Sequence, residues 1–123
     1  MSFYRDSTEC RDAGVTYHLV PESVWNSQRQ GAAYLPEAFL DDGFIHCTNG
    51  LERLLTVANL FYQRDRRPFA VLVLDVSRIT SDVRYDDPDQ HFPHIYGPLN
   101  ADAVVGRTTI ERSPDGTFLS IPT

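Results

Sequence analysis

FAVLVLDV, residues 69–76, is the stretch that decides the fold. Its apolar side chains fall on both faces of an extended chain, and Asp75, its only charged residue, comes near the end. A strand that is apolar on both faces has to be covered by packed layers on both sides. We therefore predict a central strand over residues 69–76, with the rest of the chain arranged around it.

Two further strands are predicted before this central one. Residues 15–20 (VTYHLV) are β-branched and aromatic, and their alternation puts His18 on the face opposite Tyr17. The turn at residues 42–43 leads into a second strand over residues 44–48 (FIHCT). One face of this second strand is shared by three side chains: Phe44, His46 and Thr48.

The chain after residue 100 predicts more β-structure. Residues 103–111 indicate a strand, and Ser-Pro-Asp-Gly at residues 113–116 is a turn into residues 117–121. A turn of this kind between two β-prone runs is a strong hairpin signal.

Two helices are predicted in the first half of the chain. Pro21 fits the first position of a helix that ends by Gly31. Asn49 and Glu52 resemble a capping box before the clearest helix, which starts at Leu51 and has an apolar stripe of helical period. Two helices and five or six strands, with the helices early and a hairpin late, define an α+β fold.

Length and charge narrow the classes of function. We expect one domain over residues 14–123 after a mobile lead-in of residues 1–13, since 123 residues suffice for one core. A net charge of −6 argues against nucleic acid as the main partner, because nucleic-acid binders usually carry a basic stripe. The one basic cluster, Arg64, Arg66 and Arg67, is expected to complement the end of a helix. A small anionic ligand such as a nucleotide stays compatible with this charge.

The location of the protein is also an expectation. No apolar run approaches the ~20 residues that span a bilayer, and the polar N-terminal segment lacks the apolar core of a signal peptide. Two cysteines in this setting do not make a disulfide framework. We expect a cytoplasmic protein with no membrane partner.

Histidines are the most distinctive candidates for chemistry. Residues 86–100 (DDPDQHFPHIYGPLN) form a proline-stiffened loop whose tip, residues 94–97, can pair as a short strand. If the predicted strands are neighbours, His18 and His46 could point into one cleft together with His94 or Tyr96. Imidazoles that converge in this way could bind a ligand or act as acid and base, whereas a single histidine is more often a satisfied, part-buried side chain.

Two other chemistries have candidate residues in the sequence. His91 and His94, with His46 or Cys47, offer zinc-type donors, but their spacing lies in a loop where it has little meaning. Cys47 shares a strand face with Ile45, so we expect a buried core residue rather than a nucleophile. We therefore expect no bound metal.

The order of several motifs resembles a known family. YHLV (residues 17–20), GFIHCT (43–48), TVANLFY (56–62), LVLDV (72–76) and FPHIYGPL (92–99) are similar to the bacterial family catalogued as domain of unknown function 952. This family is similar in fold to the ADP-ribosyltransferase group, whose split, mostly antiparallel β-sheet binds NAD. The resemblance implies a small single α+β domain with such a sheet and two main helices.

The resemblance also implies roles for particular residues. In the ADP-ribosyltransferase group a histidine or arginine on the first strand contacts the ribose next to nicotinamide, which matches His18. The second motif would comprise His46 and Thr48, and the third His94 and Tyr96. No glutamate occupies this third motif; Glu111 or Asp75 could substitute.

These implications define the site that we predict. Its catalytic candidates are His18, His46, His94 and Tyr96, and its cofactor-binding candidates are His18, Tyr34, Thr48 and Asn59. The protein is expected to bind NAD or a related nucleotide and to transfer or hydrolyse ADP-ribose. The alternatives are a non-catalytic module that binds a small ligand and a metal-dependent hydrolase that uses the histidines.

Overall fold

The predicted central strand is the middle strand of an antiparallel sheet in the computed structural model, which describes residues 14–28 and 31–122. β3 (Phe69–Asp75) lies between β1 (Val15–Pro21) and β6 (Val104–Thr109). In this sheet His18 is the partner of Leu72. The prediction from the apolar pattern of residues 69–76 is confirmed, whereas the lead-in expected at residues 1–13 lies outside the described residues.

Both faces of β3 are buried, as its sequence requires. Ala70, Leu72 and Leu74 belong to one core cluster, together with Ile45 and Ile95 of the second sheet. The residues that alternate with them, Phe69 and Val71, belong to another cluster. That second cluster is closed by a helix and by the C-terminal hairpin through Leu54, Ala58 and Phe118.

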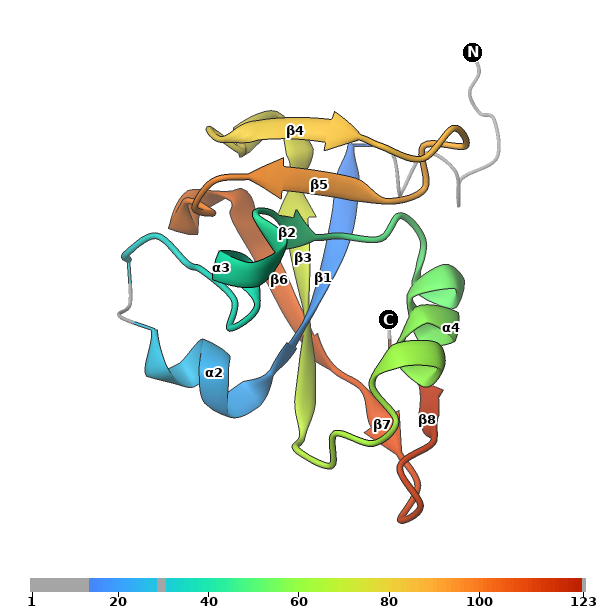
Figure 1. Cartoon of the computed structure of the whole chain (residues 1–123). Coiled ribbons are helices and arrows are strands. Elements are labelled where there is room, and N and C mark those ends of the chain that lie inside the picture. The colour runs from blue at the N-terminus through green and yellow to red at the C-terminus, as the bar shows by residue number, and fades with distance from the viewer. Residues whose placement is uncertain (1–13, 29–30, 123) are drawn as a thin grey trace.

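The second sheet runs across the first (Figure 1). It contains β2 (Ile45–His46), β5 (Pro93–Tyr96) and β4 (Asp82–Tyr85), in the order β2-β5-β4, and all pairs are antiparallel. The strand predicted within residues 86–100 is therefore confirmed, but the prediction missed β4. β4 is an edge strand with polar side chains that face solvent, so its sequence lacks an apolar signal.

The two sheets meet at one isolated bridge. The amide of Tyr17 donates to the carbonyl of Thr48 at 3.0 Å, and the amide of Thr48 donates to the carbonyl of Tyr17 at 2.8 Å. Among the described strands, β1 pairs with β3 and β2 with β5, and beyond this bridge β1 and β2 do not pair with each other. β1 and β2 thus part immediately after Tyr17, and His18 is the first residue past the junction.

In the part of the chain that the structure describes, three helices and two short 3₁₀ turns connect the strands. The helices are α2 (Glu22–Ser27), α3 (Phe39–Asp42) and α4 (Leu51–Phe61), and the turns are η1 (Val76–Arg78) and η2 (Ala101–Ala103). The start of α4 at Leu51 is confirmed, but the predicted capping box is wrong. Gly50 occupies the N-cap position, and the Asn49 amide donates instead to the carbonyl of Gln90. α2 ends at Ser27, so Gly31 does not cap it as predicted.

The predicted C-terminal hairpin is present as β7 (Glu111–Arg112) and β8 (Phe118–Ser120). Arg112 attaches this hairpin to the loop after α4, because its guanidinium donates to the carbonyls of Asp65 and Arg67. The same guanidinium lies 4.0 Å from the centre of the Phe118 ring. The domain is thus a small α+β fold with antiparallel sheets and few helices. None of the helices in the described residues is long and apolar enough to span a membrane.

Candidate functional site

A pocket of about 130 Å³ opens where β1 and β2 part. It is lined by His18 on β1, by Thr48 after β2, and on one side by Leu54 and Val57 of α4. The segment from Tyr34 to Ala38 and the end of α3 form the opposite side. The pocket therefore lies against the junction between the two sheets.

His18 and Tyr34 make an uncharged pair on the wall of this pocket. The His18 Nδ1–H donates to the carbonyl oxygen of His46 at 2.7 Å, because a carbonyl can only accept. The Nε2 of His18 is then the acceptor for the Tyr34 hydroxyl, at 2.8 Å. Burial lowers the pKa of His18 to about 4 and raises the pKa of the Tyr34 phenol, so both groups are neutral near pH 7.

This pair is rigid because both side chains are buried and fully oriented. The exposed fractions are 4% for His18 and 1% for Tyr34, and the rings meet edge to face with centroids 5.4 Å apart. Trp25 packs on the other side of Tyr34 in a similar geometry. Because its hydrogen is directed at His18, the phenol oxygen of Tyr34 has lone pairs left to accept a hydrogen bond from a ligand.

His46 lies at the mouth of the pocket and is held by a carboxylate. Its Nε2 is 2.9 Å from Oδ2 of Asp42, and both residues line the pocket. The neutral imidazole that donates from Nε2 keeps a lone pair on Nδ1. The side chain is 52% exposed, so a ligand can reach it. His46 is thus placed to act as a base or to bind a polar ligand group.

Three charged residues close one end of the pocket. The guanidinium of Arg67 bonds to Asp65 at 2.7 Å and to Glu37 at 3.0 and 3.2 Å, and all three residues line the pocket. The hydrogen bonds from Arg67 lower the pKa of the Asp65 carboxyl. The prediction that this arginine complements a helix end is therefore wrong, since Arg67 joins two loops across the pocket.

His94 and Tyr96 lie beside the pocket but do not line it. The strand pairing puts His94 on the same face of the second sheet as His46, and Asp86 accepts from His94 Nδ1 at 2.8 Å and from the Tyr96 hydroxyl at 2.6 Å. Phe44 stacks on His94 at 4.0 Å and also lines the pocket. Phe44 thus separates His94 from the pocket, and the three histidines do not line one cleft as predicted.

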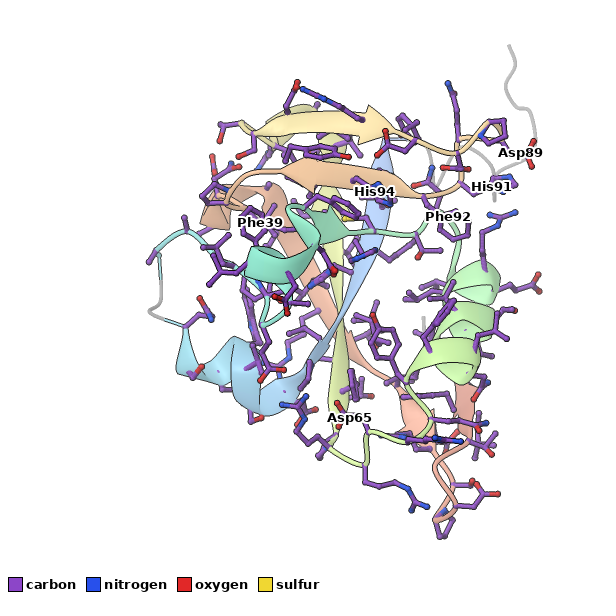
Figure 2. The ribbon with its side chains drawn as sticks, viewed as in Figure 1. Phe39, Asp65, Asp89, His91, Phe92 and His94 are labelled. Atoms are coloured by element: carbon purple, nitrogen blue, oxygen red, sulfur yellow. The ribbon has the colours of Figure 1, made fainter. Side chains whose placement is uncertain are left out.

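The three histidines nevertheless lie next to one another. The backbone carbonyl of His46 accepts from His18, and the His46 ring centroid is 5.4 Å from that of His94. His91, which the predicted site left out, is at the turn between β4 and β5, close to Asp89 (Figure 2). The structure therefore gathers the predicted imidazoles, but only His18 and His46 face the pocket.

Asn59 and the two substitute acids lie elsewhere. The Asn59 amide donates to the carbonyl of Phe118 at 3.0 Å, and its oxygen accepts from the amide of Phe118 at 2.8 Å, so it ties α4 to β8. Asp75 caps η1 through Ser77, and Glu111 accepts from Ser120 on the neighbouring strand. None of these three residues lines the pocket, and of the three only Asn59 had been predicted to bind a cofactor.

The donor set for a metal is absent from the described residues. Within residues 14–28 and 31–122, no group of three His, Cys, Asp or Glu side chains is arranged to hold a metal ion. Cys47 is buried in the core at 2% exposure, and burial raises the pKa of its thiol, as expected for a packing residue.

The acids and the arginine of the pocket were not identified from sequence as site residues. Glu37 and Asp65 occur in loops with no motif around them. Asp42 precedes a glycine, and this pair indicates a turn and not a binding site. Phe44 did carry a signal, since its position two residues before His46 puts both on one strand face. The charged residues carry no comparable pattern, because contacts between separate loops bring them together.

The fold and the pocket define a small α+β domain built on two crossed antiparallel sheets. Residues 19–107 match the family described as protein of unknown function (DUF952), and the chain belongs to that family. No curated protein matches the sequence.

Solved structures of one bacterial protein are similar to this chain. The crystal structure of protein CC0527 from Caulobacter crescentus is 20% identical, with 85% of this chain and 93% of that chain covered and a TM-score of 0.71. The solution NMR structure of CC0527 is 21% identical, with coverages of 89% and 92% and a TM-score of 0.65. At this level of identity the likeness shows a shared fold.

Proposed function

We propose that the pocket binds NAD or a closely related nucleotide, with the nicotinamide end inside. The observation that carries this proposal is the uncharged His18–Tyr34 pair, fixed where the two sheets part. The separation of β1 from β2 also supports a likeness to the split sheet of the ADP-ribosyltransferase group. His18 occupies the first-strand position that the resemblance assigns to a ribose contact.

The size of the pocket supports insertion of one ring rather than of a whole dinucleotide. A buried cavity of about 150 Å³ accommodates benzene. A pocket of about 130 Å³ is therefore suited to a single six-membered ring with small substituents. The remaining parts of the nucleotide would extend past His46 and Arg67 toward solvent.

The charges around the pocket favour the oxidised nicotinamide ring, which is a cation. Asp42 and Asp65 are among the residues that line the pocket, and His18 is neutral. Opposite charges attract more strongly near a protein surface than in bulk water. The same carboxylates would favour the positive charge that develops on the ribose when the nicotinamide bond breaks.

The His46–Asp42 pair favours catalysis over simple capture. In the proposed reaction the bond between ribose C1′ and the nicotinamide nitrogen breaks, and nicotinamide leaves with the bonding electrons. A water molecule or another hydroxyl adds to C1′, and its proton passes to Nδ1 of His46. Asp42 would orient His46. It would also supply a carboxylate in place of the glutamate that is missing from the third motif, residues 94–97.

Calorimetry followed by an activity assay tests this proposal. Titration with NAD and with ADP-ribose should show binding by the wild type, and absence of binding at millimolar ligand would count against the function. Thr48→Tyr should block the pocket and abolish binding, whereas His91→Gln, outside the pocket, should bind as the wild type does. Circular dichroism confirms that each variant is folded.

Release of nicotinamide then separates an enzyme from a binding module. The wild type should release nicotinamide from NAD, and His46→Gln should bind NAD but release about 100-fold less, as expected for loss of a general base. If the wild type binds NAD and releases none, the non-catalytic module is the better description.

A further inference from the structure

Arg67 presents two different edges of its guanidinium to two carboxylates. The edge with Nε and Nη2 bonds to Asp65, at 3.0 and 2.7 Å. The edge with Nη1 and Nη2 bonds to both oxygens of Glu37, at 3.2 and 3.0 Å. Arg67 thus has one carboxylate from its own loop and a second from the segment before α3.

The two carboxylates are held very differently. Asp65 also accepts from the backbone amide of Arg67, at 3.2 Å, and the Asp65 carbonyl is bound by Arg112, so this partner is anchored. Glu37 is bound by Arg67, and its side chain is 58% exposed. Exposed ion pairs of this kind contribute little to stability. Glu37 can therefore leave at low cost while Asp65 keeps the guanidinium in place.

A bidentate carboxylate occupies the position that a phosphate would take. Arginine binds carboxylates and phosphates through the same pair of parallel N–H donors. Arg67 lines the pocket, so a phosphate attached to a ligand in the pocket would meet this edge.

We propose that Arg67 is the phosphate-binding residue of the pocket and that Glu37 is a displaceable placeholder on its outer edge. This inference rests on the proposed function, and it identifies the feature that selects phosphorylated ligands. When a nucleotide binds, its phosphate oxygens replace the two oxygens of Glu37 on Nη1 and Nη2. Asp65 keeps its bonds to Nε and Nη2, so Arg67 needs no reorientation.

The test compares ligands that differ only in their phosphates. Nicotinamide riboside, nicotinamide mononucleotide and NAD are titrated into the wild type, Glu37→Gln, Arg67→Met and the double variant. Glu37→Gln should tighten binding of the two phosphorylated ligands by about three- to fivefold, the size of one exposed ion pair. Arg67→Met should weaken them by about tenfold or more, as for loss of hydrogen bonds to a charged group. Nicotinamide riboside should change by less than about twofold.

The double variant separates direct exchange from a general charge effect. If Glu37 acts by occupying Arg67, the gain from Glu37→Gln should vanish in the Arg67→Met background. A gain that persists there would overturn the inference. Glu52→Gln and Arg64→Met make the same changes of net charge outside the pocket, and equal effects in these variants would overturn it as well.

Inorganic pyrophosphate distinguishes failure of this inference from failure of the proposed function. If no nicotinamide ligand binds to any variant, the proposed function fails. Pyrophosphate should still bind to Glu37→Gln more tightly than to the wild type and should lose this gain in the double variant. If the nicotinamide ligands bind with no difference among the variants, the pocket function stands and the role of Arg67 is refuted. Thermal melts confirm that all variants are folded.

Discussion

The buried, neutral His18 makes the stability of this protein depend on pH in a defined window. In the folded chain its pKa is about 4, whereas an ordinary histidine has a pKa of 6.5. Below pH 6.5 the unfolded chain therefore binds a proton that the folded chain excludes. The folding stability that depends on a neutral His18 is therefore fully present above pH 6.5 and is lost as the pH falls toward 4.

The magnitude follows from the difference between the two pKa values. A tenfold change in proton affinity corresponds to about 1.4 kcal/mol, so His18 costs the folded state about 3 kcal/mol at pH 4. About 2 kcal/mol of this loss is already expected at pH 5. That pH lies above the ordinary pKa range of carboxyl groups, about 3.9 to 4.3, so most of their titration is avoided.

Urea denaturation at pH 7.5 and pH 5.0 measures this effect. The free energy of unfolding of the wild type should fall by about 2 kcal/mol more than that of His18→Asn, which can still donate to the His46 carbonyl but does not titrate. The other histidines are common to both proteins, so their contributions cancel in the comparison. His91→Asn is the control and should follow the wild type. Equal pH dependence of the wild type and His18→Asn would refute the burial and neutrality of His18.

Three further substitutions test contacts that hold the site in place. Tyr34→Phe should cost about 1–3 kcal/mol of unfolding free energy in urea, because Nε2 of His18 is left buried without a donor; no loss would mean that this hydrogen bond is absent. Asn59→Leu should cost about 2 kcal/mol and speed amide exchange at Phe118, since it removes both hydrogen bonds that tie α4 to β8, and unchanged exchange would contradict this role. Gly116→Ala should lower the thermal midpoint by an amount that corresponds to about 1–3 kcal/mol. The reason is that φ of Gly116 is +99° and an added Cβ would lie 2.5 Å from a backbone carbonyl oxygen. An unchanged midpoint would mean that the hairpin turn is free to relax.

Strand faces were predictable from sequence because they depend on local alternation. The apolar residues of β3 had to be covered on both sides, and the two core clusters cover them. The alternation in residues 44–48 put Cys47 on one face with Ile45 and predicted that Cys47 is a core residue, and both are buried. The edge strand β4 escaped prediction, since a solvated edge requires no apolar pattern.

The composition of the pocket depended on how distant segments pair. His18 and His46 were identified from sequence, and their proximity follows from the bridge between Tyr17 and Thr48. His94 was also identified, and its position directly opposite His46 in the ladder puts the two rings on the same face of the second sheet. Phe44 stacks on His94 and lines the pocket in its place, a contact between separate segments that neither segment specifies alone.

The sequence by itself determined the central strand, the main helix, the C-terminal hairpin and the residues most suited to chemistry. These features follow from periodicity, turn residues and side-chain type, which are local properties of the chain. Only the tertiary structure decided that His18 is neutral, because burial and the partners His46 and Tyr34 come from other segments. It likewise brought Glu37 and Asp65 onto the guanidinium of Arg67, since charged loop residues carry no pattern that specifies their partners.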